Sequence, residues 1–152
     1  MDRIDRKLLE LLQDDADRPL AELAEKVHLT QTPCWKRIQK LQKDGVIRKK
    51  VALCEPSKLN LGLTAFVAVR TQQHNEQWLR KFAAAVQSIP EIVEAYRMSG
   101  DIDYMLRVVV PDIQGYDTVY RKLIRAVELS DVSSSFAMER IKYSTALPVD
   151  FA

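Results

Sequence analysis

Residues 20–45, LAELAEKVHLTQTPCWKRIQKLQKDG, hold two helical patterns with very little chain between them. The first pattern places apolar residues at the spacing of one helix face, namely Leu20, Leu23, Ala24 and Val27. The second opens at residues 30–33 and ends at Gly45, a residue that commonly stops helices. Because only residues 27–30 connect the two, the chain must turn sharply there. The pattern predicts a helix-turn-helix.

The second helix of this pair has two chemically different faces. Its apolar positions are Cys34, Ile38 and Leu41, and its basic positions are Lys36, Lys40 and Lys43. Both sets follow the spacing i, i+4, i+7, so one face packs while another presents cations. Residues 31–50 carry seven basic side chains and one acidic one, whereas residues 1–30 carry five basic and eight acidic side chains. This localised charge indicates an anionic partner, with a merely solvated helix face as the alternative.

A further helix precedes this pair. Its apolar residues repeat at helical spacing and Asp2 is placed to cap its start, the repeat being Ile4, Leu8, Leu11 and Leu12. Residues 46–55 are interpreted as a strand-like wing and exit strand. Residues 1–55 are therefore predicted to form a winged helix-turn-helix domain. Three helices with a cationic third helix favour DNA binding over the solvated-face alternative.

The expected DNA contacts lie on the third helix and the wing, because first turns of recognition helices enter the major groove and flanking cations meet phosphates. The candidates are Gln31, Thr32, Trp35, Lys36, Arg37, Lys40, Lys43, Lys49 and Lys50. Glutamine and arginine suit base edges, while the lysines at 40, 43, 49 and 50 suit phosphates. Packing against neighbours is an equal alternative for Trp35. A dimer would read a pseudo-palindromic site in double-stranded DNA.

Residues 56–152 have a different pattern, in which segments typical of strands alternate with segments typical of helices. Strands are predicted over 63–71, 91–98, 104–110 and 132–143, and helices over 76–89 and 112–127. The order βαββαβ predicts a ferredoxin-like sandwich with both helices on one sheet face, and hence an α+β protein overall. The other face is too apolar for water, and pairing with another copy is expected through Tyr96, Met98, Val109 and Phe136.

Three stretches give the chain a family resemblance: DRIDRKLL at residues 2–9, TPCWKRI at 32–38 and SGDIDY at 99–104. In this order and spacing they resemble the leucine-responsive/asparagine-regulator (Lrp/AsnC) family of transcription factors over essentially the whole chain. The resemblance implies an effector-sensing second domain and homodimers that usually assemble further, often to octamers. Residues 32–37, 61–66 and 134–139 are similar to the branch that contains cysteine-detoxification regulators.

The loop before the third strand carries Asp101 and Asp103, whose carboxylates tend toward one side. Two like charges require a cation or donor, and an amino acid supplies an ammonium while Gly100 lets backbone reach its carboxylate. The resemblance places the effector pocket here, between dimers. The candidate set is Gly100, Asp101, Asp103, Tyr104, Ser133, Ser134 and Ser135. The small hydroxyls indicate a neutral effector, and the branch resemblance makes it cysteine. The alternative is a turn capped by its own aspartates.

Other functions are weighed against this interpretation. A tetrapyrrole (siroheme-type) decarboxylase of the same architecture would need a cationic cleft, for which Arg97 and Arg107 are weak support. An architectural protein that binds DNA without sequence preference or effector is the second alternative. Cys34, at a helix start among cations, raises a redox alternative, although its place in the apolar set makes it a core residue first. No catalytic or metal-ligand spacing and no cofactor motif is found, so no enzyme activity is expected.

The composition agrees with a globular protein of one large or two small domains. The chain has 152 residues, of which 47% are hydrophobic and 29% charged. No apolar run is long enough to span a membrane, and residues 1–7 are too charged for a signal peptide, so the cytoplasm is expected. His28, at a position where the family often has glycine, is interpreted as a turn residue and not a metal ligand, and His74 as an ordinary loop residue.

Overall fold

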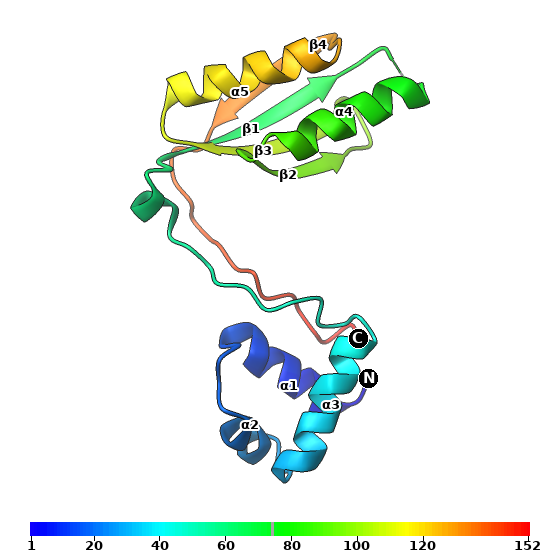
Figure 1. Ribbon diagram of the computed structural model, residues 1–152, viewed down its shortest axis with the longest axis vertical. Helices are drawn as coiled ribbons and strands as arrows, with labels where there is room; N and C mark the ends of the chain where they lie inside the picture. Colours follow the sequence, from blue (N-terminus) through cyan, green and yellow to red (C-terminus); the bar gives the residue numbers. More distant parts are fainter. Residues whose placement is uncertain (74) are drawn as a thin grey trace. The chain divides into compact units, whose positions relative to one another are not determined.

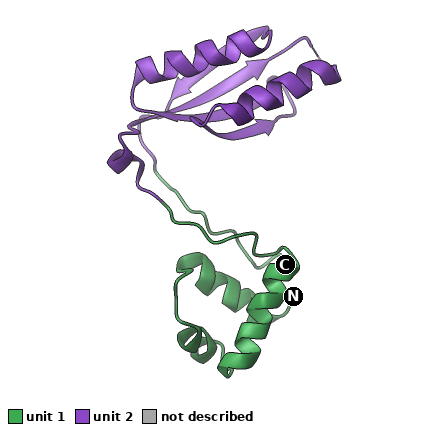
Figure 2. Ribbon diagram, in the orientation of Figure 1, with its two compact units in different colours: residues 1–53, 141–152 green, residues 54–140 purple. Residues whose placement is uncertain are grey.

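The computed structural model describes residues 1–73 and 75–152, so His74 lies outside the described residues (Figure 1). The chain forms two compact units, residues 1–53 with 141–152 and residues 54–140 (Figure 2). The sequence-based division assigned residues 141–152 to the second domain, whereas the structure groups them with the first. The Gln13 side chain explains this grouping, because its Nε2 donates to the Leu147 carbonyl at 3.1 Å and its Oε1 accepts from the Leu147 N–H at 2.7 Å.

The first unit contains the three expected helices, α1 (Arg3–Asp14), α2 (Leu20–Lys26) and α3 (Gln31–Lys43). Asp2 and Asp5 form a reciprocal capping box at the start of α1. Leu8 and Cys34 are fully buried in the core between the helices. The link between α2 and α3 turns at His28, whose φ of 56° confirms its interpretation as a turn residue.

The predicted wing is not a strand. Residues 46–55 adopt no regular secondary structure, and a short 3₁₀ helix, η1 (Pro56–Leu59), follows them. The segment leaves α3 through Gly45, at φ 74°, and the Ile47 N–H donates to the Leu41 carbonyl at 3.1 Å. A strand exists only when a neighbouring strand satisfies its backbone groups, and the four-stranded sheet of the described chain includes none of these residues.

The second unit confirms the predicted βαββαβ order. It consists of β1 (Leu63–Arg70), α4 (Glu76–Ser88), β2 (Ile92–Arg97), β3 (Tyr104–Val110), α5 (Ile113–Ala126) and β4 (Asp131–Phe136). The strands form one antiparallel sheet in the order β2-β3-β1-β4, and both helices cover the same face (Figure 1). The core between sheet and helices includes Val69, Leu106 and Phe82, all buried.

β4 is shorter than the predicted strand over 132–143. Phe136 pairs with Ala65, and the Ala137 N–H donates to the Thr64 carbonyl at 2.9 Å. Since β1 begins at Leu63, residues beyond 137 have no strand left to pair with. The available partner, and not the β-propensity of residues 138–143, ends the strand.

The sheet face away from the helices, called here the open face, carries Phe66, Tyr96, Met105 and Val109. Phe66 and Tyr96 are exposed, while Val109 is buried by its neighbours. Phe136, expected on this face, lies instead on the helix side. It pairs with the core residue Ala65 and makes an edge-to-face contact with Tyr116, whose ring centroid is 5.2 Å away. Strand alternation combined with the observed register decides its side.

Candidate nucleic-acid interface and effector loop

The outward side of α3 is formed by side chains at helical spacing opposite the buried Cys34, Ile38 and Leu41. The exposed residues there include Thr32, Lys36 and Lys43, with Gln31 and Trp35 toward one flank. Trp35 is 50% exposed, so half of its surface is available to a partner. This side therefore offers cationic, hydroxyl, amide and aromatic groups together, a combination suited to phosphates and base edges.

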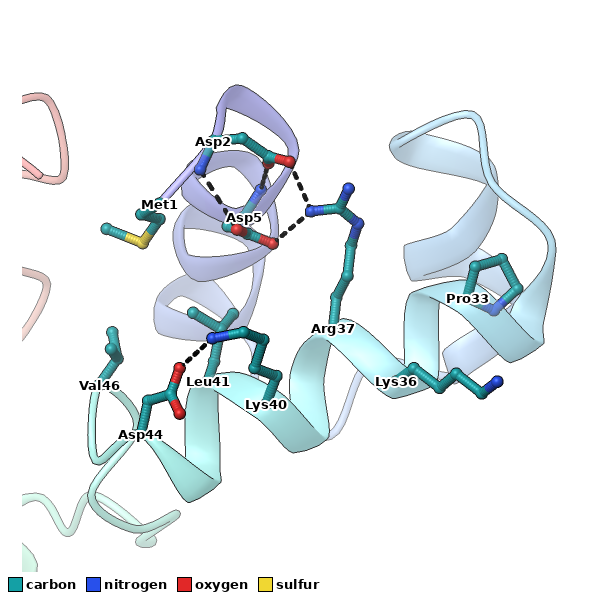
Figure 3. A pocket seen from close by; sticks show the side chains of 10 residues that line it. All are labelled: Met1, Asp2, Asp5, Pro33, Lys36, Arg37, Lys40, Leu41, Asp44 and Val46. Carbon is teal, nitrogen blue, oxygen red and sulfur yellow. Dashed lines mark hydrogen bonds and ion pairs between the residues drawn. The ribbon is translucent and has the colours of Figure 1, made fainter.

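Arg37 has a different environment from its neighbours on α3. Its Nη1 lies 2.6 Å from Asp2 Oδ2 and 2.8 Å from Asp5 Oδ1, which belong to the capping box of α1 (Figure 3). The hydrogen bond to Asp5 raises the pKa of the Arg37 guanidinium most, and the hydrogen bond to Asp2 raises it further. The pKa of Asp2 is lowered, chiefly by the hydrogen bond from the Asp5 N–H and then by Arg37. We therefore interpret Arg37 as the residue that holds α3 against α1.

The contacts of Arg37 lie at one wall of a groove between α1 and α3. The groove has a volume of about 810 Å³ and is lined by Met1, Asp2, Asp5, Pro33, Lys36, Arg37, Lys40, Leu41, Asp44 and Val46 (Figure 3). Within it, Lys40 forms an ion pair with Asp44 one turn further along α3. Two cations of the groove, Arg37 and Lys40, are thus paired with carboxylates of the same unit, so we do not place an anion in the groove.

The remaining predicted lysines differ in their surroundings. Lys43 and Lys49 are exposed. Lys50 donates from Nζ to the Ala16 carbonyl at 2.9 Å, just beyond the end of α1. This contact ties the segment after α3 to α1, so Lys50 has a structural role in addition to the predicted phosphate contact.

Gln39 is an interface candidate that the sequence reasoning missed. It is exposed on α3, one turn beyond Trp35, and its Nε2 donates to Gln42 Oε1 at 3.1 Å. The pair leaves the Gln39 carbonyl oxygen and the Gln42 amide group available, the two groups that read adenine edges. The i+4 spacing from Trp35 was the signal that could have identified it.

Arg37→Ala is expected to lower the melting temperature of the first unit, because it leaves the Asp2 and Asp5 carboxylates facing each other without their cation. Lys36→Ala, one residue away and exposed, is the matched control and is expected to leave the melting temperature unchanged. Thermal unfolding followed by circular dichroism measures both. Equal melting temperatures for the two variants would contradict the positioning role of Arg37.

In the second unit the structure separates the two loop aspartates. Asp103 Oδ2 accepts from the buried Thr71 N–H at 2.8 Å, and the Asp103 carbonyl accepts from the Met98 N–H at 2.8 Å. The Asp103 carboxylate thus holds this loop to the residue that follows β1, and the amide that it bonds does not belong to its own turn, as the capped-turn alternative required. Asp101 is exposed, and its carboxylate makes no ion pair or hydrogen bond to any described residue. Gly100 has φ 109°, a conformation that requires glycine at this turn.

The other predicted effector residues are not gathered in one place. Tyr104 packs in the core cluster, with its ring 4.5 Å from that of Phe82. Ser134 lies on the helix side and bonds the Tyr116 hydroxyl, whereas Ser133 and Ser135 lie on the open face. Ser135 pairs with Phe66, five residues from Thr71 along β1, or roughly 17 Å at strand rise. Within one chain, Ser135 on β4 is therefore distant from the loop between β2 and β3.

Cys34 does not have the properties of a redox thiol. It is fully buried, and burial raises its pKa, whereas a reactive thiol needs a lowered one. Cys54 is exposed. We expect the folded protein to react with one equivalent of a thiol reagent such as Ellman's reagent and to yield the second only in denaturant. Rapid native reaction of two thiols would contradict the buried position of Cys34, and a Cys54→Ser variant identifies which thiol reacts.

Two further observations concern residues 1–73 and 75–152. No helix there has both the length and the apolar character needed to cross a membrane. No group of three or more histidine, cysteine, aspartate or glutamate side chains in the same ranges is arranged to hold a metal ion.

Comparison with known proteins supplies relatives that span the whole chain. Residues 1–42 match the AsnC-type helix-turn-helix domain and residues 64–147 match the Lrp/AsnC ligand binding domain. The DNA-binding transcriptional activator DecR of Escherichia coli K12 is 52% identical, over 99% of both chains. The glutamate uptake regulatory protein of Zymomonas mobilis is 47% identical over 98% of this chain and 91% of its own.

Solved structures agree in fold. An AsnC family transcriptional regulator from Agrobacterium tumefaciens superposes with a TM-score of 0.96 and 56% identity, over 99% of both chains. A Neisseria meningitidis transcriptional regulator in complex with L-Met has a TM-score of 0.94 and 32% identity, over 99% of this chain and 98% of its own. The matched domains, the full-length relatives and the α3 surface agree with the predicted resemblance, and the chain belongs to the Lrp/AsnC family of transcriptional regulators.

Proposed function

We propose that this protein is a sequence-specific DNA-binding regulator of transcription of genes for amino-acid metabolism, and that it responds to a small amino-acid effector. The observation that carries the DNA part is the outward side of α3, where exposed Thr32, Trp35, Lys36 and Lys43 lie at helical spacing. Support comes from the relatives, since the Escherichia coli protein is named as a DNA-binding transcriptional activator. Such a regulator acts in the cytoplasm, where it meets its operator.

We further propose an assembly built on homodimers, which associate through the open face and then combine further, up to octamers. Exposed Phe66 and Tyr96 support the dimer, because exposed aromatic side chains on a sheet face are stabilised by burial against another surface. Two copies related by a twofold axis would present two α3 helices to a pseudo-palindromic operator.

For the effector we propose cysteine or another small neutral amino acid. The similarity of residues 134–139 to cysteine-detoxification regulators favours cysteine. The Neisseria relative bound to L-Met supports an amino acid in general. The effector would bind with different affinities to two assemblies, and this difference would couple it to the spacing of the DNA half-sites.

The test is a fluorescence-anisotropy titration with DNA from upstream of the protein's own gene, repeated with each of the twenty amino acids. Specific binding that one or two amino acids shift supports both parts of the proposal. Binding that no amino acid shifts contradicts the effector part, and binding indifferent to sequence favours an architectural protein. Absence of DNA binding at moderate salt contradicts the proposed function altogether.

Two variants of Asp103 separate a positioning role from a direct one. Asp103→Ala is expected to lose the effector response while DNA affinity without effector stays the same, because the Thr71 N–H loses its acceptor. Asp103→Asn keeps an oxygen for that N–H but no charge, and we expect it to keep most of the response. Loss of the response in both variants would instead assign the charge of Asp103 to the effector.

A further inference from the structure

We propose that Gln13 is a positioning residue for DNA binding, because it fastens the C-terminal segment, residues 141–152, to the end of α1. The fastened segment would act as a second link between the two units and would limit how freely the first unit moves. The inference rests on the proposed DNA binding by a dimer. It adds a residue outside α3 and names the part of the chain through which that residue acts.

The chain passes between the two units twice. It leaves the first unit after Leu53 to form the second unit, and it returns to the first unit at Ile141. Figure 2 shows the change of unit on each of the two connecting segments. A returning segment with a free end would add no restraint to that of the first connection. The second passage therefore matters only because the returning segment is attached to the first unit.

Gln13 makes this attachment through both polar atoms of its side-chain amide. Its Nε2 donates to the Leu147 carbonyl at 3.1 Å, and its Oε1 accepts from the Leu147 N–H at 2.7 Å. Both backbone groups of one residue are thus held by one side chain. Because hydrogen bonds are directional, the pair fixes the direction of the C-terminal segment as well as its position.

The apolar side chains of the C-terminal segment contribute little to holding it in place. Ile141, Leu147 and Phe151 are 91%, 72% and 92% exposed. A terminal segment stays ordered when burial or hydrogen bonding ties it down, and these three side chains supply little burial. The backbone contacts are therefore important for the attachment, and Gln13 makes two of them.

The connection that leaves α3 is attached close to the same point of the first unit. Lys50 Nζ donates to the Ala16 carbonyl at 2.9 Å, just beyond the end of the helix that carries Gln13. In the second unit the two connections also start together, because the Ala137 N–H donates to the Thr64 carbonyl at 2.9 Å. Two links that are anchored at both ends restrict bending and rotation more than a single flexible link does.

This restriction affects how a dimer would bind two half-sites. Once one α3 is bound, binding of the second is intramolecular, and it is most favourable when the spacing of the two helices already matches the DNA. Without the contacts of Gln13, the first unit would move more freely and the operator would be bound less tightly. Binding to one half-site would not change, because Gln13 lies on α1 and not on the outward side of α3.

The experiment is a fluorescence-anisotropy titration of the full chain with DNA from upstream of its own gene, and with the same DNA after one half-site is scrambled. Gln13→Ala is expected to weaken binding to the intact operator by about 10-fold and to leave single half-site binding unchanged. Gln13→Met keeps the side-chain length without the amide and is expected to have the same effect. Gln87→Ala is the matched control, since Gln87 is exposed on α4 in the other unit.

Hydrogen exchange tests the attachment itself and requires no DNA. In Gln13→Ala, the amide of Leu147 is expected to exchange about 10-fold faster than in wild type, because its acceptor is removed. The amides within α1 are expected to keep their exchange rates, which shows that the helix remains folded. Unchanged exchange in residues 141–152 would overturn the inference.

The DNA titrations can overturn the inference in two further ways. Wild-type affinity of both Gln13 variants for the intact operator would show that the attachment has no part in DNA binding. Equal weakening on the intact operator and on the single half-site would show that Gln13 only supports the fold of the first unit. In both cases the proposed function stands, because wild type still binds its operator. If wild type itself shows no sequence-specific binding, the proposed function fails and the inference fails with it.

Discussion

Lys36→Glu is expected to weaken operator binding by about 100-fold at moderate salt while the protein stays folded and assembled. Lys36 is exposed on the outward side of α3, so the substitution replaces an attraction to a phosphate by a repulsion without disturbing the core. A loss of about 1.4 kcal/mol at each half-site corresponds to about 100-fold in affinity for a dimer. Fluorescence anisotropy with labelled operator DNA measures it.

The salt dependence distinguishes this contact from a change in fold. Lys36→Gln, which removes the charge without reversing it, should reduce the slope of log K against log salt by about 2 for a dimer, one per phosphate contact. Lys81→Glu is the control, because Lys81 is exposed on α4 in the other unit. If Lys36→Glu binds the operator like wild type, α3 does not enter the groove through this side.

Phe66→Asp is expected to dissociate the proposed dimer. Phe66 is 43% exposed on the open face, and burial of a phenylalanine side chain contributes about 1.5–3 kcal/mol. A symmetric dimer loses this contribution twice and must also desolvate two carboxylates, so the dissociation constant should rise by about 100-fold to 10,000-fold. Sedimentation velocity at micromolar concentration measures the change in assembly.

Leu79→Asp is the matched control for this experiment. Leu79 is 40% exposed, close to Phe66 in accessibility, but it lies on α4 in the helix layer and not on the open face. It is expected to leave the assembly intact. An unchanged sedimentation coefficient for Phe66→Asp would show that the copies associate through another surface, and it would leave the DNA-binding proposal in place.

The local signals in the sequence predicted the order and type of the helices and of the strands in the sheet. Helical spacing placed Cys34, Ile38 and Leu41 on the buried side of α3, and the short link after α2 indicated the turn at His28. These features depend on residues close to one another in the chain, so periodicity and turn chemistry suffice to predict them. The same reasoning placed Lys36 and Lys43 on the exposed side.

The predictions that differ from the structure all concern partners distant in sequence. The wing and the extension of β4 lack a neighbouring strand, and residues 141–152 belong with α1 because Gln13 holds the backbone of Leu147. Phe136 faces the helices because the register pairs it with Ala65. Strand propensity describes a segment alone, whereas a strand also requires hydrogen-bonding partners, which propensity does not specify.

The candidate sites also have some features that depend on nearby residues and others that depend on partners distant in sequence. The sequence by itself determined the family, the cationic face of α3 and the acidic loop, because each is a matter of residue type and short spacing. Only the tertiary structure decided that Arg37 pairs with Asp2 and Asp5, that Asp103 binds the Thr71 N–H, and that Gln13 holds Leu147. A charged side chain shows its charge in the sequence, but its role depends on which groups the fold brings within hydrogen-bonding distance.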